Sequence, residues 1–353
     1  MAIIPKNQAK LFPKVGKISM LIFAVLFLIV GFRAYTLFGY IFKPNVAKSA
    51  IILIPSGADY KAVETIVLQK NILTEPKAFR WVSKKKAYKT SVKPGRYGIK
   101  KGWNTNQLVN LLRSGEQTPM KVTFNNVRFF DELAGKIDRY FEADSVQFLA
   151  VLSNDSLIVN YHFRPETFSA MFVPNTYQLY WTTTPTEFVE RMNREYLKFW
   201  NESRLEKAKT LGLTPVEVTT LASIVQEETI KEAEKAIVAG LYLNRLKRGM
   251  LLQADPTIKY AIHDFTVRRI TNLMLEVDSP YNTYRYKGLP PGPINFPEIT
   301  SIDAVLNAKN HSYLYMCAKE DFSGSHNFST NLTQHNIYAA RYRKALNQNK
   351  IYK

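Results

Sequence analysis

The sequence predicts an α+β protein with a single amino-terminal transmembrane helix. An apolar run covers residues 18–42, and at about 1.5 Å per residue it can cross a hydrocarbon core of about 30 Å. Beyond it, short β-branched runs such as residues 49–55 and 122–124 alternate with stretches of helical periodicity such as residues 60–69. Strands and helices mixed along one chain indicate an α+β exported portion.

Lysines predict which side of the membrane each part occupies. Residues 1–17 contain four lysines and no acidic residue, so we expect them in the cytoplasm, with residues 18–42 as the span and the remainder outside. A cleaved signal peptide is the alternative, because residues 18–32 have the length of a signal-peptide core. No clean small-x-small cleavage site follows, however, and apolar residues resume after Arg33. We therefore expect a retained anchor in the inner (cytoplasmic) membrane.

The composition limits the classes of partner. With 353 residues, 46% of them apolar, the chain can bury at least one core and is not a disordered protein. Its formal charge of +19 favours a polyanionic neighbour. For an exported protein this means anionic lipid or an acidic wall polymer, and we expect no nucleic-acid partner. The single Cys317 cannot form an internal disulfide, so the exported part depends on its core.

The predicted helix over residues 214–229 carries the main catalytic candidate. Thr214 at the N-cap, Pro215 and Glu217 form a capping box. At about 100° per residue, Glu228 lies at the edge of the apolar stripe, whereas Glu227 points almost the opposite way. A carboxyl group on the core side loses hydration, so its pKa rises and it can donate a proton near neutral pH. The alternative is a structural carboxylate paired with Lys or Arg.

Polar, turn-rich segments follow Gly249 and continue toward the carboxyl terminus. Their amides and hydroxyls match sugar hydroxyl and acetamido groups, and their aromatic rings can cover a sugar face. The substrate-binding candidates are Gln253, Asp255, Tyr281, Asn282, Thr283, Tyr284 and Asn331. Asp255 has two other interpretations, as the second carboxylate of a two-carboxylate glycosidase or as a helix cap in Asp-Pro-Thr.

The sequence gives little support for a metal site or for a nucleophilic hydrolase. His326 and His335 are nine residues apart, which is no zinc pattern, and no cysteine pair accompanies them. We expect no metal and no cofactor. Ser223 lies within a helix, no G-x-S-x-G motif is present, and Cys317 has no neighbouring histidine motif, so a nucleophilic hydrolase is disfavoured. In the middle of the chain, PGRY at 94–97 and PNTY at 174–177 are weak internal echoes, each most simply a turn.

Four ordered blocks resemble the YceG-like endolytic murein transglycosylase family: LASIVQEET, LLQADPTIKYAI, SPYNTYRYKGLPPGPI and SHNFSTNLTQHN. The segment near residues 50–120 also resembles the LysM-like subdomain of that family. The resemblance implies a LysM-like β/α module at 45–121, a connecting α+β region at 122–201 and a carboxy-terminal α+β catalytic domain at 202–353.

The family implies an inner-membrane enzyme that cuts nascent peptidoglycan strands internally and can end their elongation, with peptidoglycan synthases as possible partners. Glu228 inherits the catalytic role from the family block Glu-Lys-Glu-Thr. In that block this chain has Gln226 and Glu227 in place of the first glutamate and the lysine. It also has Ala254 where the family commonly has Thr, and Asn175 for an aspartate.

The implied mechanism needs only one acid. Glu228 protonates the oxygen between N-acetylmuramic acid and N-acetylglucosamine, and then accepts the proton of the muramyl 6-hydroxyl as that oxygen attacks the anomeric carbon. A 1,6-anhydro end results. Two rival hypotheses remain: a non-catalytic glycan-binding scaffold of the wall-synthesis machinery, and a hydrolytic two-carboxylate glycosidase.

Overall fold

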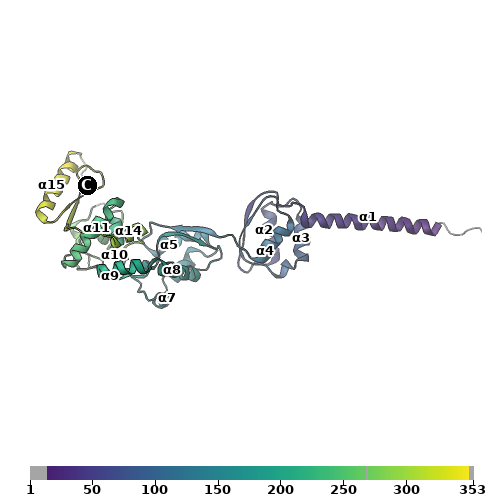
Figure 1. Ribbon diagram of the computed structural model, residues 1–353, viewed down its shortest axis with the longest axis horizontal. Coiled ribbons are helices and arrows are strands. Elements are labelled where there is room, and N and C mark those ends of the chain that lie inside the picture. The colour runs from purple at the N-terminus through teal and green to yellow at the C-terminus, as the bar shows by residue number, and fades with distance from the viewer. Residues whose placement is uncertain (1–13, 268, 350–353) are drawn as a thin grey trace, which may run out of the picture. The chain divides into compact units, whose positions relative to one another are not determined.

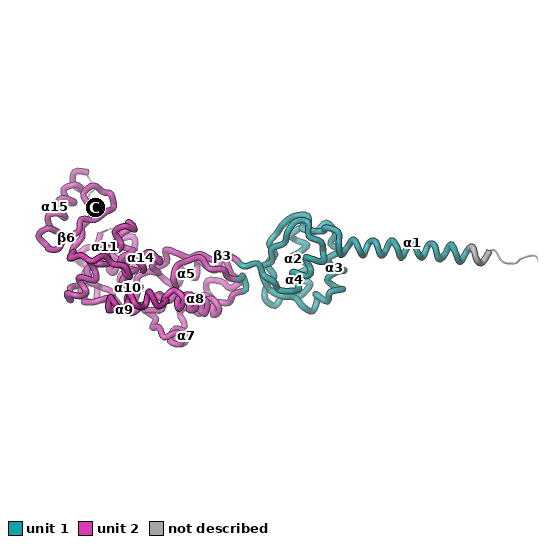
Figure 2. Tube along the Cα trace, in the orientation of Figure 1, with its two compact units in different colours: residues 1–119, 180–182 teal, residues 120–179, 183–353 magenta. Residues whose placement is uncertain are grey.

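The computed structural model describes residues 14–267 and 269–349 (Figure 1). Most of the expected cytoplasmic segment 1–17 therefore lies outside the described residues. The chain forms two compact units, Met1–Pro119 with Tyr180–Thr182 and Met120–Leu179 with Thr183–Lys353 (Figure 2). Helices and small antiparallel sheets occur together, which confirms the predicted mixture of α and β structure.

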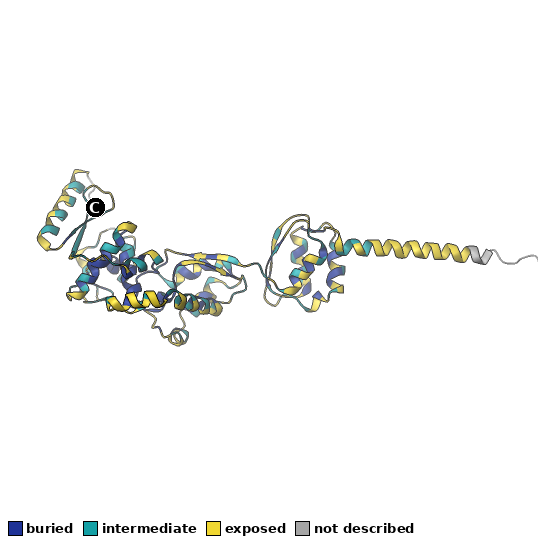
Figure 3. Cartoon of the chain, viewed as in Figure 1, coloured by how far each residue is buried: buried dark blue, intermediate teal, exposed yellow. Residues whose placement is uncertain are grey.

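The first unit begins with α1 (Lys14–Phe42). Its segment Ile18–Phe42 is apolar and long enough to cross a membrane, and none of its most apolar window is buried. In Figure 3 most of this helix has the colour of exposed residues. Phe27, for example, is 78% exposed. The predicted apolar amino-terminal helix is confirmed, whereas its retention in a membrane and its orientation stay predictions.

The rest of the first unit is a small α/β module. Its elements are β1 (Ala50–Ile54), α2 (Tyr60–Gln69), α3 (Pro76–Lys85), the 3₁₀ turn η1 (Tyr88–Thr90), β2 (Gly95–Ile99) and α4 (Thr105–Ser114). The strands pair antiparallel, with Ile52 opposite Tyr97. Alternate strand residues such as Ile52 and Ile54 point inward, because side chains alternate across a strand, and they pack against Val63, Phe79 and Leu108 of the helices.

The second unit begins with a similar succession. Its elements are β3 (Met120–Phe124), α5 (Phe130–Ile137), η2 (Asp138–Tyr140), α6 (Ser145–Leu152), α7 (Asp155–Asn160), η3 (Phe168–Met171), β4 (Asn175–Leu179) and α8 (Pro185–Phe199). The strands β3 and β4 pair antiparallel. Phe124, Phe148 and Phe188 lie in a largely aromatic core.

The strand pairs β1–β2 and β3–β4 share a local feature at the two similar sequence segments, 94–97 and 174–177. Tyr97 of β2 donates its hydroxyl to the carbonyl of Lys93 at 3.0 Å, and Tyr177 of β4 donates to the carbonyl of Val173. In both cases the tyrosine lies four residues after its acceptor and closes the turn that leads into the strand. The similarity is one of local design, and the LysM-like nature of the first module stays a prediction.

The carboxy-terminal part of the second unit is mainly helical. It contains α9 (Glu202–Leu211), α10 (Pro215–Glu228), α11 (Glu232–Lys247), α12 (Asp255–Ala261), α13 (Asn272–Leu275), α14 (Ile299–Leu306), β5 (Tyr315–Ala318), β6 (His326–Ser329) and α15 (Leu332–Gln348). Residues 218–225 of α10 are all buried, so neighbouring segments surround this helix. Among them are α11 and α14, which both contact it.

The second unit continues across residue 202, where the catalytic domain is expected to begin. Phe296, from the carboxy-terminal part, packs on Phe130 at 5.4 Å and on Phe172 at 6.0 Å between ring centroids. Gly292 also needs close backbone approach, since a Cβ there would lie 1.8 Å from the carbonyl oxygen of Glu166. The division at residue 202 stays a prediction about function.

Residues 313–315 have the composition of a strand, but β5 begins only at Tyr315. The carbonyls of Tyr313 and Leu314 accept hydrogen bonds from the side chains of Asn244 and Arg245, at 3.1 and 2.7 Å. These carbonyls are therefore used to join α11 to the incoming chain.

Candidate active site

The candidate site lies at the carboxyl end of α10. The predicted capping box is present at the other end: the Glu217 amide donates to the Thr214 hydroxyl at 3.2 Å, and the Thr214 amide donates to the Glu217 carboxylate at 2.8 Å. The helix ends at Glu228 because Thr229 has an extended backbone, with φ of −147°. Glu228 is thus held on a rigid, buried helix at its last turn.

The two residues before Glu228 are bound elsewhere. Gln226 accepts a hydrogen bond from the Glu298 amide at 2.7 Å. The carboxylate of Glu227 accepts one from Asn295 at 2.9 Å and forms an ion pair with Arg128 at 3.4 Å. A carboxylate oxygen could accept the bond that Gln226 accepts, so this departure from the family pattern preserves an acceptor. Glu227 is oriented away from Glu228, as the helical periodicity predicts.

Tyr242 of α11 holds the Glu228 carboxyl group. Its hydroxyl donates to Oε1 of Glu228 at 2.7 Å. Burial raises the pKa of Glu228 to about 7, although the hydrogen bond from Tyr242 opposes this rise; the carboxylate of Asp255 adds to it. Burial also raises the pKa of Tyr242 well above its ordinary value. Tyr242 therefore remains a donor, and a large fraction of Glu228 is protonated at neutral pH.

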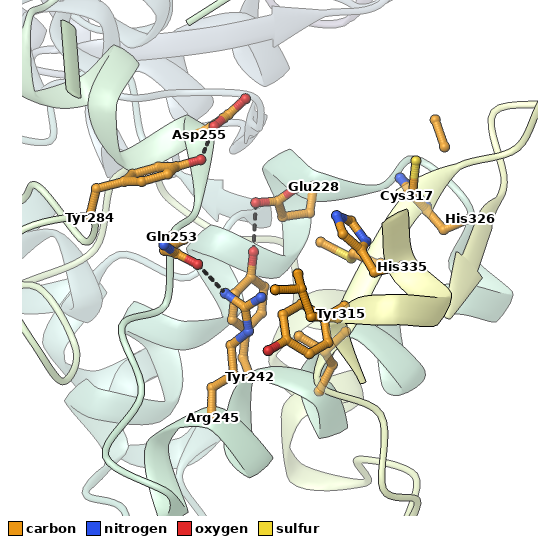
Figure 4. A pocket seen from close by; sticks show the side chains of 14 residues that line it. Glu228, Tyr242, Arg245, Gln253, Asp255, Tyr284, Tyr315, Cys317, His326 and His335 are labelled. Carbon is orange, nitrogen blue, oxygen red and sulfur yellow. Dashed lines mark hydrogen bonds between the residues drawn. The ribbon is translucent and has the colours of Figure 1, made fainter. Parts of the chain in front are cut away.

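Glu228 borders a cavity of about 370 Å³ (Figure 4). Three predicted substrate-binding residues, Gln253, Asp255 and Tyr284, line the same cavity. The other walls come from α11, from the β5–β6 hairpin and from α15, which supply Leu241, Tyr242, Arg245, Tyr315, Met316, Cys317, Ala318, His326, Leu332 and His335. Loops thus form one wall, as the sequence predicts, and regular elements form the rest.

Two loops join to place Gln253, Asp255 and Tyr284. Gln253 has a left-handed backbone, with φ of 50°, and its amide donates to the carbonyl of Thr283 at 3.1 Å. The hydroxyl of Tyr284 donates to Oδ1 of Asp255 at 2.5 Å. Asp255 is the first residue of α12, whose N-cap is Ala254. The interpretation of Asp255 as the cap itself is therefore wrong by one position.

Asn282 and Thr283 are buried beneath these loops. Asn282 donates to the carbonyls of Leu275 and Val277, at 2.9 and 2.8 Å. The hydroxyl of Thr283 lies 2.8 Å from that of Thr257. Neither residue reaches the cavity, because both side chains are used within the protein interior. The substrate contact expected of them is therefore corrected to a supporting position under Gln253 and Tyr284.

Tyr281 and Asn331 also lie away from the cavity lining. Tyr281 packs on Tyr260, with ring centroids 4.6 Å apart. Asn331 caps α15 by accepting a hydrogen bond from the Gln334 amide at 2.9 Å, which fixes the first turn of the helix that carries Leu332 and His335 into the wall. In this structure both residues position elements of the site.

Several cavity residues were not predicted as site residues. Tyr242 and Arg245 are three residues apart in α11, so they share a face, and this helical spacing was the available signal. His326 and His335 line the cavity although they form no zinc pattern. Nδ1 of His326 lies 2.9 Å from the Glu234 carboxylate, and burial lowers the pKa of His335.

A half-buried carboxyl group with a pKa near 7, in a cavity with other polar groups, is typical of an enzyme site that transfers protons. The chain belongs to the YceG-like family, whose model matches residues 52–341. The family resemblance noted in the four sequence blocks is therefore confirmed.

Three known proteins illustrate the similarity. An endolytic murein transglycosylase of Bacillus subtilis is 28% identical over 312 residues, which cover 84% of this chain and 86% of that protein. One of Streptococcus pneumoniae strain D39 is 25% identical and matches 85% of this chain, but only 60% of its own length is covered. A crystal structure of a YceG-like protein from Listeria monocytogenes has 26% identity and a TM-score of 0.54, covering 82% of this chain and 99% of that one.

The raised pKa predicts an effect of Glu228→Gln on stability. A carboxyl group that titrates near 7 when folded and near 4.5 when unfolded favours folding below pH 4.5, and this contribution is lost as the pH rises to 7. The neutral amide has no such loss. Relative to wild type, the variant should therefore gain on the order of 2 kcal/mol in unfolding free energy between pH 5 and pH 8.

Urea denaturation of the full chain in detergent, followed by tryptophan fluorescence, measures this difference. Glu227→Gln is the matched control, because it removes the ion pair with Arg128 and should not gain stability as the pH rises. If Glu228→Gln changed the unfolding free energy by the same amount at pH 5 and at pH 8, Glu228 would not be a buried acid.

Proposed function

We propose that this protein is a membrane-anchored lytic transglycosylase that cuts the bond between N-acetylmuramic acid and N-acetylglucosamine within peptidoglycan strands. The observation that carries the proposal is the carboxyl group of Glu228, half-buried at the cavity, with a pKa of about 7 and a fixed hydrogen bond from Tyr242. The relatives named endolytic murein transglycosylase support the substrate class.

Glu228 acts first as a general acid. Its proton is transferred to the glycosidic oxygen while the bond to the muramyl anomeric carbon breaks, which leaves an oxocarbenium-like centre. The carboxylate that results is stabilised by the Tyr242 hydroxyl on Oε1 and by the positive charge of Arg245 nearby. Glu228 can therefore act in both its protonated and its ionised state.

The same carboxylate then acts as a base. It accepts the proton of the muramyl 6-hydroxyl as that oxygen attacks the anomeric carbon, so the product carries a 1,6-anhydro ring and Glu228 is protonated again. No water is consumed. A single carboxyl group is sufficient because the substrate supplies its own nucleophile.

The loop wall orients the strand. In our proposal Gln253, Asp255 and Tyr284 contact the sugars, since their side chains line the cavity with Glu228. Asn282, Thr283, Tyr281 and Asn331 hold the elements that carry those contacts. Asp255 is engaged by Tyr284 at 2.5 Å, so its role here is to orient the wall and to favour the protonated form of Glu228.

The anchor and the positive charge fit a function at the outer face of the membrane. We assign residues 18–42 as the span, with residues 1–17 in the cytoplasm and the enzyme outside. The formal charge of +19 favours contact with anionic lipid or wall polymers. The module at 45–121 is proposed to be LysM-like and to bind glycan, residues 122–201 to connect it, and residues 202–353 to catalyse. Ending strand elongation beside peptidoglycan synthases is the expected role.

Product analysis tests the reaction. Wild-type protein incubated with uncrosslinked peptidoglycan strands should release fragments with 1,6-anhydromuramyl ends, and Glu228→Gln should lower that rate by at least about 100-fold because no proton can be donated. Mass spectrometry distinguishes the outcomes, since a hydrolytic product is heavier by one water.

Glu227→Gln is the control, because its carboxylate is bound to Arg128 and Asn295 and should not take part in the reaction. Only reducing ends in the product would identify a hydrolase with Asp255 as second carboxylate. An unchanged rate in Glu228→Gln would favour the scaffold hypothesis.

The pH dependence tests the part played by Tyr242. In wild type the rate should fall as the pH rises through about 7, where Glu228 loses its proton. Tyr242→Phe removes the hydrogen bond that lowers this pKa. The fall in rate should therefore move to higher pH, together with a lower maximal rate.

Tyr315→Phe serves as control, since Tyr315 lines the cavity but has no hydrogen bond to Glu228 among the described residues. Its profile should match that of wild type. A shift of the Tyr242→Phe profile to lower pH would contradict the assignment.

A further inference from the structure

Arg245 is a buried cation in the wall of the cavity. It lies in the last turn of α11 and is only 7% exposed. Nε donates to the carbonyl of Leu314 at 2.7 Å, and Nη1 donates to that of Leu252 at 2.7 Å. Nη1 also lies 3.5 Å from Oε1 of Gln253. Figure 4 shows the guanidinium between Gln253, Tyr242 and Tyr315.

These bonds engage Nε and Nη1 of the guanidinium. Within residues 14–267 and 269–349, Nη2 has no hydrogen-bond partner and Arg245 forms no ion pair. The other charged residues of the cavity are engaged differently, because Asp255 accepts from Tyr284 and His326 pairs with Glu234. An arginine that is buried without a carboxylate is costly, and an anionic ligand removes that cost.

The substrate supplies a reason for such a charge. Peptidoglycan alternates two sugars that both carry an acetamido group, and only N-acetylmuramic acid carries a lactyl ether with a carboxylate or a stem peptide. An enzyme that cuts on one side of the muramyl residue must distinguish the two sugars. Contacts to the acetamido group or the 6-hydroxyl do not achieve this, since both sugars offer them. The two sugars differ only at O3, which carries the lactyl ether in N-acetylmuramic acid.

We infer that Arg245 is the residue that selects the muramyl sugar, by donating from Nη2 to a carboxylate carried on the muramyl side chain. This inference rests on the proposed function and names the group by which that site recognises its substrate. Lactyl and stem-peptide carboxylates share the same chemistry. Either can accept a charge-assisted hydrogen bond from Nη2, whose position is fixed by the bonds that Nε and Nη1 make to carbonyls.

A binding experiment can test this without catalysis. The ligand is the disaccharide with N-acetylmuramic acid at its reducing end, which lacks the muramyl-to-glucosaminyl bond that the enzyme cuts. Isothermal titration of the full chain in detergent at pH 6 compares the free lactyl acid with its methyl ester. Wild type should bind the acid at least about tenfold more tightly, since a charge-assisted hydrogen bond is lost in the ester.

The variants separate recognition from packing. Arg245→Met should bind acid and ester alike, because the cation that distinguishes them is removed. Arg245→Lys should keep part of the preference, because it retains the charge and loses the fixed position of the Nη2 donor. If Arg245 had a purely structural role, its substitution would weaken the binding of the acid and of the ester equally. Thermal unfolding of each variant shows whether it folds.

A third ligand distinguishes the two sources of the carboxylate. In the lactyl-alanine conjugate the lactyl group is an amide and the carboxylate lies on the amino acid. Preference for this conjugate over its own methyl ester would identify the stem peptide as the group bound, and preference only for the lactyl acid would identify the lactyl group.

The inference is overturned if wild type binds acid and ester equally, or if Arg245→Met keeps the preference. If Arg245→Met does not fold, the wild-type and Arg245→Lys comparisons still decide. Failure of the proposed function appears separately, as an unchanged cleavage rate in Glu228→Gln.

Discussion

The hydrogen bond between Tyr242 and Glu228, formed in a largely dehydrated place, is the interaction on which the site depends. It joins the end of α10 to the middle of α11 at 2.7 Å. Burial alone would leave the Glu228 proton bound too firmly for a carboxylate to take part afterwards, and solvent exposure would leave no proton to give. With the Tyr242 hydroxyl on one oxygen, the carboxyl group has a pKa of about 7 and can serve in both states.

One face of α11 carries both a residue that supports proton transfer and a residue that brings positive charge to the cavity. Tyr242 holds Glu228, and three residues later Arg245 brings a positive group to the same cavity. Arg245 also binds the carbonyl of Leu314, at the entry to the β5–β6 hairpin that forms another wall. A rigid pair of helices therefore fixes the reacting group, while loops and a hairpin attached to that pair provide the surface for the strand.

Local signals predicted the elements better than they predicted the site. The capping box at Thr214 and the apolar stripe of α10 were readable, because caps and periodicity depend on neighbours in the chain, and they placed Glu228 correctly at the helix end. Asn282 and Thr283 were predicted to bind substrate because polar residues in turn-rich segments usually lie at the surface. Their burial depends on carbonyls of Leu275 and Val277 and on Thr257, which no local pattern identifies. The roles of Tyr242 and Arg245 likewise become recognisable only when α11 packs beside α10.

The protonation of Glu228 at neutral pH is the central claim, and a titration of its side-chain carboxyl carbon tests it most directly. Protein labelled with carbon-13 at the glutamate carboxyl is followed by NMR from pH 4 to pH 9, and the resonance absent from Glu228→Gln identifies the residue. We expect a midpoint of about 7. A midpoint near 4.5, the value of an ordinary glutamate, would contradict it.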